Sequence, residues 1–180
     1  EEQTAYREYY ECVLQNLKSY TNFDSLGHLD YVVRYGPTKN KNYAWTQYQE
    51  ILDAILRILI KNEIALEVNT GGYKYGLGEP NPCADILKRY KELGGKLLTI
   101  GSDAHDPAYL AYEFSRLREL LISCGFSSYH IFKKRAPTMT VWNGSIKTSI
   151  KTTTARNDSN KLRCRFGLLF IYRIVPPPAT

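Results

Sequence analysis

A short apolar run that leads directly into acidic and imidazole side chains constrains the fold of this chain more than any other stretch. Residues 97–100 (LLTI) are typical of a buried strand, and GSDAH follows at residues 101–105. Ligands and metals bind at the carboxyl ends of strands in α/β proteins, because loops there aim polar groups inward over a rigid strand. If the backbone stays extended, alternation places Asp103 and His105 on the same side.

Asp103 and His105 alone leave two interpretations open, because the pattern is short. They are either solvated or helix-capping loop residues, or they are ligands of a metal. A second stretch, GHLD at residues 27–30, again places a histidine after a glycine, within a strand that we predict over 23–33. Two strands that each present an imidazole or a carboxylate at one end favour a metal site, since these ligands together suit zinc, manganese or iron.

Four blocks of the sequence resemble the carboxyl half of a histidinol-phosphatase of the PHP family. They are GHLDYVVRYG (27–36), ALEVNTGGYKYGLGEPNP (65–82), ILKRYKELGGKLLTIGSDAHDPAYLAYEF (86–114) and GFSSYHIFKKR (125–135), in the order and spacing of the family. The resemblance implies an α/β fold over residues 1–135, namely part of a distorted (β/α)7 barrel that is similar to a TIM barrel. It also implies a cytoplasmic enzyme of histidine biosynthesis that hydrolyses L-histidinol phosphate to L-histidinol and phosphate.

The resemblance assigns roles to individual residues. It implies that His28, Asp103 and His105 are metal ligands and that Asp103 and His105 are catalytic. The complete site of the family holds up to three divalent metal ions, which we expect to be zinc, manganese or iron. We therefore expect a small phosphorylated substrate as the partner.

Two basic side chains are candidates for holding the substrate phosphate. In the family a basic residue near Arg34 meets the phosphate, although a surface arginine is an equally good interpretation. Lys74 lies in the glycine-rich stretch 70–80, whose backbone can approach a phosphate closely. The family usually has an arginine here; lysine meets phosphate as a point charge but lacks the bidentate fork of arginine.

Glu67 and Asn69 lie on one face of a strand that we predict over 64–69. A glutamate inside such an apolar run is rarely buried without a reason. We expect Glu67 to pair with a cation in the barrel interior and both residues to support the metal ligands from behind. His130, in the middle of a predicted strand over 128–132, is interpreted as a packed or surface histidine.

The rest of residues 1–135 alternates between helices and strands. Amphipathic patterns predict helices over 3–19, 43–61, 81–93 and 107–124, the last with Asp106 as N-cap and Pro107 as its first residue. This order is typical of a parallel α/β barrel, of which about half is present. The open edges of half a sheet favour self-association.

The family site also needs an amino-terminal His-x-His, a bridging glutamate and further histidines. This chain contains only His28, His105 and His130. We therefore expect a fragment that lacks its first half and has little or no phosphatase activity. Three hypotheses stay open: part of a histidinol-phosphatase, a PHP phosphoesterase that acts on another substrate, and a non-enzymatic remnant or interaction module.

Composition and charge separate residues 136–180 from the rest. The chain is 43% hydrophobic and 23% charged, which is typical of a globular domain, but its whole excess charge of +6 lies after Arg135. We predict a basic, Ser/Thr-rich tail that is disordered or poorly packed, with nucleic acid a minor alternative as partner. Its apolar run 166–175 is too short to span a membrane.

The cysteines predict reduced thiols. Cys12, Cys83, Cys124 and Cys164 are widely separated and form no C-x-x-C pair. Together with the absence of a signal-peptide pattern at residue 1, this spacing indicates a cytosolic protein without disulfides.

Overall fold

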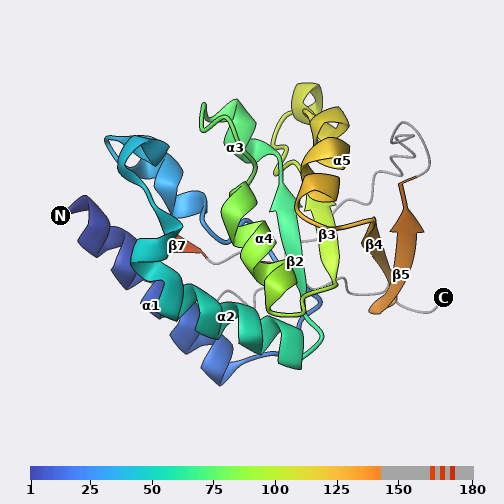
Figure 1. The fold of residues 1–180 in the computed structure, drawn as a ribbon, viewed down its shortest axis with the longest axis horizontal. Coiled ribbons are helices and arrows are strands. Elements are labelled where there is room, and N and C mark those ends of the chain that lie inside the picture. The colour runs from blue at the N-terminus through green and yellow to red at the C-terminus, as the bar shows by residue number, and fades with distance from the viewer. Residues whose placement is uncertain (143–162, 165–166, 169–170, 173–180) are drawn as a thin grey trace.

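The computed structural model describes residues 1–142, 163–164, 167–168 and 171–172. The helices are α1 (Glu2–Ser19), α2 (Gln49–Lys61), α3 (Gly71–Lys74), α4 (Ala84–Glu92) and α5 (Phe114–Ser123), with 3-10 helices at Tyr31–Tyr35, Lys39–Asn42, Trp45–Tyr48 and Pro107–Tyr109. The strands are β1 (Ser25–Leu26), β2 (Ala65–Asn69), β3 (Leu98–Gly101), β4 (Ser128–Lys133), β5 (Ala136–Val141), β6 (Arg163–Cys164), β7 (Gly167–Leu168) and β8 (Ile171–Tyr172). Figure 1 shows their arrangement.

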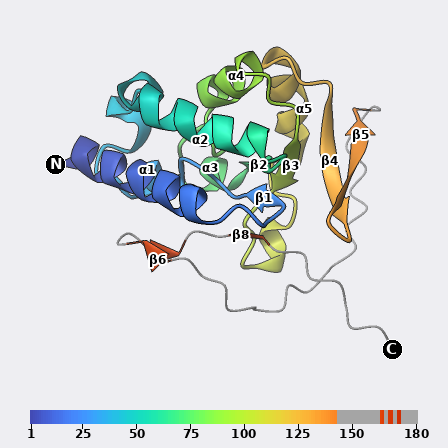
Figure 2. The same ribbon diagram turned by 90° about the horizontal axis from the view of Figure 1, so that it is seen from below.

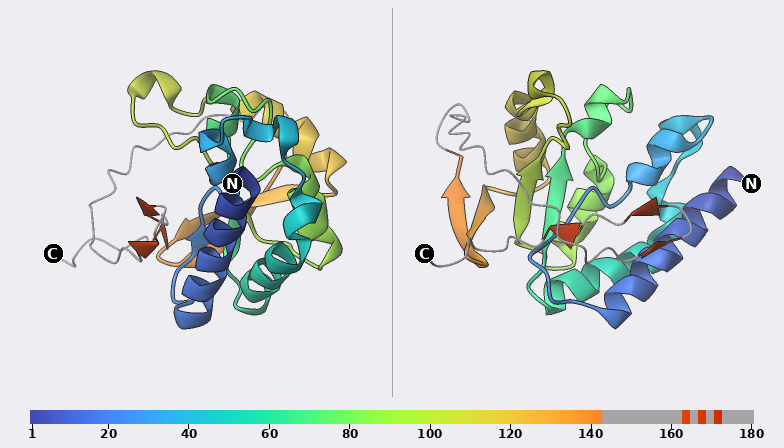
Figure 3. Two further views of the ribbon diagram at one scale, coloured as in Figure 1. Left: turned by 90° about the vertical axis from the view of Figure 1, so that its left-hand side faces the viewer. Right: turned by 180° about the vertical axis from the view of Figure 1, so that it is seen from behind.

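A four-stranded sheet forms the centre of the molecule in the order β3-β2-β1-β8. Strands β1, β2 and β3 are parallel, whereas β8 runs antiparallel to β1. Helix α4 lies in front of β2 in Figure 1, and the strands lie in front of α4 when the molecule is seen from behind (Figure 3). The predicted α/β class is confirmed, and the described strands form an open sheet.

The two faces of the sheet differ in polarity. Leu66, Val68 and Leu98 belong to the buried hydrophobic core together with the helices. Glu67 alternates with them on β2 and pairs in register with Thr99 of β3, so the opposite face is polar. On that polar face Ser25 Oγ lies 2.7 Å from Thr99 Oγ1, within hydrogen-bond distance.

Helices α1 and α2 lie side by side along the sheet (Figure 2). The apolar face of α2 repeats every three or four residues, and its buried members are Ile51, Leu52, Ile55, Leu56 and Leu59. Helix α1 contributes tyrosines to the core: Tyr10 is fully buried and its hydroxyl lies 2.9 Å from the Tyr43 hydroxyl. Burying one such large side chain contributes about 1.5–3 kcal/mol.

The predicted strand over 23–33 is wrong in extent. Only Ser25–Leu26 is a strand, and Tyr31–Tyr35 forms a 3-10 helix. The backbone of His28 has φ 30, in the left-handed region, which ends the extended conformation. The apolar residues Tyr31, Val32 and Val33 are buried by this helix and not by a strand.

The predicted helix over 107–124 is divided. Asp106 caps a 3-10 helix as expected, since its side chain accepts a hydrogen bond from Ala108 N at 2.8 Å. The chain then turns through Ala111 and Glu113, whose φ values of 53 and 55 are left-handed, before α5 begins. The helix predicted over 43–61 is likewise a 3-10 helix at 45–48 followed by α2.

Strand β4 does not join the main sheet. It pairs antiparallel with β5, and Lys134 and Arg135 form the turn between them with φ values of 51 and 66. Positive φ at both central residues is typical of the type I′ turn, which matches the twist of a hairpin. The predicted boundary at Arg135 therefore falls inside a hairpin, and residues 136–141 are a strand. The remainder of the predicted tail lies largely outside the described residues.

The prediction of four free thiols is wrong for Cys12, which is disulfide-bonded. Cys83 and Cys124 are free. The spacing of cysteines along a sequence does not reveal which of them the fold brings together. Among the described residues, no helix is long and apolar enough to cross a bilayer.

Candidate functional site

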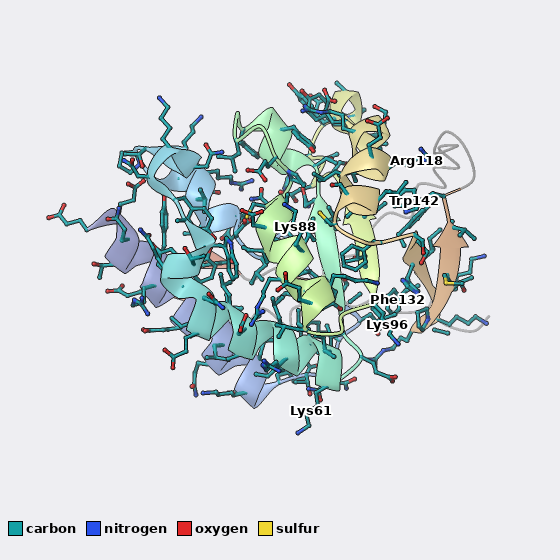
Figure 4. The ribbon with its side chains drawn as sticks, viewed as in Figure 1. Lys61, Lys88, Lys96, Arg118, Phe132 and Trp142 are labelled. Atoms are coloured by element: carbon teal, nitrogen blue, oxygen red, sulfur yellow. The ribbon has the colours of Figure 1, made fainter. Side chains whose placement is uncertain are left out.

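Three loops at the carboxyl ends of neighbouring parallel strands carry the predicted site residues. His28 and Arg34 follow β1, Lys74 follows β2, and Asp103 and His105 follow β3. Because these strands run in one direction, their carboxyl ends meet at one edge of the sheet. Lys61 and Lys96 lie at the opposite end of the sheet (Figure 4).

Glu67 anchors the loop after β1 to β2. Its Oε2 accepts hydrogen bonds from the His28 backbone N–H at 3.1 Å and from Asn69 Nδ2 at 3.0 Å. Asn69 Oδ1 in turn accepts a bond from Gly71 N at 2.8 Å. Glu67 and Asn69 thus lie together beside the His28 backbone. The hydrogen-bond partners that the structure gives Glu67 are an amide and a backbone N–H, where we expected a cation.

Burial dominates the electrostatics of Glu67. It raises the pKa of this carboxyl to about 7, although the hydrogen bonds from Asn69 and His28 favour the charged form. The chain makes room for the carboxylate by having no side chain at Gly101, where a Cβ would overlap Glu67 Oε1. Gly101 therefore leaves the space that the Glu67 carboxylate of the neighbouring strand β2 occupies.

Asp103 lies close to His105. Its side chain is 10% exposed, and its Oδ1 is 3.9 Å from His105 Nδ1. Asp103 has φ 47, a left-handed conformation that costs free energy in a non-glycine residue and is concentrated at functional sites. Because residues 102–105 are not extended, the predicted alternation of Asp103 and His105 does not apply.

His105 is exposed, and its contact with Asp103 shows which of its two ring nitrogens carries the proton. Nδ1 lies 2.8 Å from the carbonyl oxygen of Asp103, and the side chain is 71% exposed. A carbonyl oxygen can only accept, so Nδ1 carries the proton in this contact. Nε2 is then the nitrogen available to a metal.

His28 is buried, with 3% of its surface exposed, and its ring packs 4.5 Å from the ring of Tyr31. Burial lowers the pKa of its imidazole, against an opposing effect of the nearby Asp103 carboxylate. A neutral imidazole is the form that binds metals.

Among the residues that the structure describes, no three His, Cys, Asp or Glu side chains lie close enough together to hold one metal ion. The donor chemistry of His28, Asp103 and His105 fits zinc, manganese or iron. A catalytic zinc, however, takes three protein ligands. This part of the chain therefore offers the right kinds of donor without gathering three of them around one point.

The predicted phosphate cations lie among tyrosines. The Arg34 guanidinium is 4.2 Å from the ring centroid of Tyr75, and the rings of Tyr31 and Tyr35 also flank it. Its Nη1 lies 3.9 Å from Asp103 Oδ2. Lys74 Nζ is 3.7 Å from the ring centroid of Tyr109. The sequence prediction did not include these tyrosines, although YVVRY and YKY place Tyr35 directly beside Arg34 and Tyr75 directly beside Lys74.

Asp30 is a second residue that sequence reasoning missed. It is 2% exposed, and it accepts hydrogen bonds from Asn81 Nδ2 at 2.6 Å and Cys83 N at 2.9 Å. Burial raises its pKa to about 6. The sequence did contain a signal for Asp30, because it is a carboxylate within an apolar run after His28. As argued for Glu67, such a carboxylate is rarely buried without a reason.

A cavity of about 270 Å³ lies beside Asp30. Its walls include Tyr43, Trp45, Glu79 and Cys83, and none of the predicted metal or phosphate residues lines it. Asp30 and Glu79 both accept hydrogen bonds from backbone N–H groups at the start of α4. The acidic groups of this cavity therefore have a structural role in capping that helix.

The α/β fold and this edge of the sheet are similar to those of known PHP-type proteins. Residues 1–71 match the PHP domain family. The chain is 38% identical over 128 residues to the histidinol-phosphatase of Lactococcus lactis, covering 71% of this chain and 47% of that protein. It is 30% identical to the probable histidinol-phosphatase of Clostridium acetobutylicum, covering 71% of this chain and 49% of that protein.

Solved structures agree with these matches. The crystal structure of the Lactococcus lactis histidinol phosphate phosphatase, complexed with zinc, L-histidinol and phosphate, superposes with a TM-score of 0.63 at 34% identity. The match covers 77% of this chain and 52% of that one. This chain is therefore similar to part of a PHP-type histidinol-phosphatase, and it spans about half the length of the curated relatives it matches.

Proposed function

We propose that this chain is part of a metal-dependent phosphomonoester hydrolase that converts L-histidinol phosphate to L-histidinol and phosphate. The observation that carries the proposal is that two cations, a carboxylate and two imidazoles lie in loops at the carboxyl edge of three parallel strands, where Arg34 Nη1 is 3.9 Å from Asp103 Oδ2. The similarity to a phosphatase whose structure holds zinc, L-histidinol and phosphate supports the choice of substrate. In this proposal residues 1–135 are the carboxyl half of a distorted (β/α)7 barrel.

In this proposal His28, Asp103 and His105 would be donors in a site for more than one divalent metal, which ligands from outside the described residues would complete. A bound zinc, manganese or iron would supply a water of lowered pKa and would neutralise charge on the phosphate. The chain's own contribution is to keep His28 neutral by burial and to fix the His105 ring through Nδ1. Asp103, whose carboxylate lies 3.9 Å from the His105 ring, would serve both as a metal ligand and in catalysis.

Arg34 and Lys74 would bind the phosphate oxygens. Arg34 comes from the loop after β1 and faces Asp103 of the loop after β3, so a phosphate held by the guanidinium would lie beside the carboxylate and its metal. Glu67 and Asn69 hold the first of these loops in place through the His28 backbone N–H. A cytoplasmic location and self-association through the sheet edges stay predictions.

A non-enzymatic remnant is the second candidate, and one observation favours it: the described residues do not gather three metal donors. Metal analysis of the purified chain separates the two candidates. The phosphatase proposal predicts bound zinc, manganese or iron that is lost in His28→Ala and Asp103→Ala and retained in Asp106→Ala. A chain that takes up none of the three metals would support the remnant. For this chain alone we expect little or no release of phosphate from L-histidinol phosphate.

A further inference from the structure

The ring of Tyr75 lies near both proposed phosphate cations. Its centroid is 4.2 Å from the Arg34 guanidinium and 5.7 Å from Lys74 Nζ. Both distances lie within the range of about 6 Å over which a cation is attracted to the face of an aromatic ring. One side chain thus contacts a cation of the loop after β1 and a cation of the loop after β2.

Tyrosine rings contact both cations, and in the part of the chain that the structure describes they contact Lys74 without an acidic partner that would cancel its charge. A carboxylate partner would neutralise each cation, whereas the face of a ring attracts it and leaves its full charge available to an anion. Among the described residues, the acid nearest to Arg34 is Asp103 at 3.9 Å, and no acidic side chain pairs with Lys74 within 4 Å. Tyr109 of the loop after β3 contacts Lys74 from another direction.

The position of Tyr75 is itself fixed by its backbone. Its N–H donates to Gly71 O at 3.1 Å, which ties it to α3, and its carbonyl accepts a hydrogen bond from Lys39 Nζ at 2.9 Å. These two hydrogen bonds fix the backbone that carries the Tyr75 side chain, although the residue is 36% exposed. An exposed ring held in this way has little role in the hydrophobic core.

We propose that Tyr75 is a positioning residue that sets Arg34 and Lys74 at the spacing needed to grip one phosphate group. This inference rests on the proposed function, because it takes both cations as the phosphate site. The ring and not the hydroxyl performs the role, since no hydrogen bond of the Tyr75 hydroxyl is present among the described residues. Losing the ring removes the contact that the two cations share, although Arg34 keeps its other tyrosine rings and Lys74 keeps Tyr109. The phosphate then has to set the spacing of the two cations on binding.

Binding of inorganic phosphate to the full chain, followed by calorimetry, tests the proposal. Tyr75→Ala should weaken phosphate binding about five- to tenfold, because two cation contacts are lost at once. Tyr75→Phe should stay within about twofold of the unmodified chain, because the ring remains. Tyr20→Ala, at a half-buried tyrosine after α1, is the matched control and should leave the affinity unchanged.

A second measurement follows Arg34 directly. The Nε–H proton of Arg34, observed by NMR, should carry a ring-current shift that Tyr75→Ala changes and Tyr75→Phe preserves. An unchanged Arg34 signal, or an unchanged phosphate affinity in Tyr75→Ala, would overturn the positioning role.

The Arg34→Ala and Lys74→Ala variants separate this inference from the proposed function. If both weaken phosphate binding while Tyr75→Ala does not, the phosphate site stands and the role of Tyr75 is wrong. If neither changes the affinity, or if the chain binds no phosphate, the phosphate site itself is wrong and the role of Tyr75 is overturned with it.

Discussion

Arg34 Nη1 lies 3.9 Å from Asp103 Oδ2, so a candidate phosphate ligand and a candidate metal ligand face each other from the loops after β1 and β3. The two residues are far apart in sequence and meet because their strands are parallel and flank β2. Arg34 is surrounded by tyrosine rings on its other sides. This arrangement leaves the guanidinium directed toward the edge where a phosphate and a metal would be adjacent.

Arg34→Lys should weaken phosphate binding although the charge is kept. A lysine cannot form the bidentate contact of a planar guanidinium, nor stack on the rings in the same way. We expect a loss of about 1 kcal/mol, or roughly fivefold in affinity, by calorimetry with inorganic phosphate. Lys61→Arg, at the opposite end of the sheet (Figure 4), is the control and should have no effect. Equal affinities for the Arg34→Lys variant and the unmodified chain would argue against a direct phosphate contact.

Gly101→Ala should destabilise the fold through one contact. Its Cβ would overlap Glu67 Oε1 on the neighbouring strand. Overpacking of this kind costs about 1–3 kcal/mol, measured as the free energy of unfolding in urea. The Glu67→Ala background removes the carboxylate, so the same substitution should there cost clearly less. Equal costs in both backgrounds would show that the carboxylate is not the obstacle.

The ion pair between α2 and α4 predicts a pH-dependent contribution to stability. Arg89 Nη2 lies 2.6 Å from Asp53 Oδ2 and Nε lies 2.8 Å from Oδ1, a bidentate contact. The hydrogen bonds from Arg89 lower the pKa of Asp53 below its ordinary 3.8. Because the folded-state pKa is the lower one, the stabilisation is present above pH 3.8 and is lost as the pH falls through the folded-state pKa.

Asp53→Asn should therefore cost about 0.5–1 kcal/mol at pH 7, and the difference from the unmodified chain should shrink below pH 4. Thermal unfolding at several pH values measures this. Asp85→Asn is the matched control, because the Asp85–Lys88 pair is exposed and lies within one helix, and it should change stability little. A difference for Asp53→Asn that grows toward low pH would contradict the assignment.

The parts of the fold that sequence could predict are those with a strong local pattern. The run ALEVN and the run LLTI gave β2 and β3, and the tyrosine stripe of α1 and the leucine stripe of α2 gave buried helices. The strand predicted around His28 was too long because a single left-handed residue ended it. No hydrophobic pattern reports such a backbone conformation.

The candidate site was predictable as a list of residues and not as an arrangement. The position of Asp103 after a strand indicated an edge site, but its left-handed backbone changed how His105 lies beside it. The contact of Tyr75 with Arg34 joins two loops that only the parallel sheet brings together. The disulfide of Cys12 likewise depends on tertiary structure.

Metal-dependent binding of L-histidinol phosphate tests the central claim most directly. We predict that the chain binds this phosphate more tightly with zinc than without it, by calorimetry. Asp103→Ala should abolish the zinc effect, and Arg34→Ala should weaken binding with or without zinc. Binding that is absent, or that is the same in zinc, in Asp103→Ala and in Arg34→Ala, would contradict a joint metal and phosphate site at this edge of the sheet.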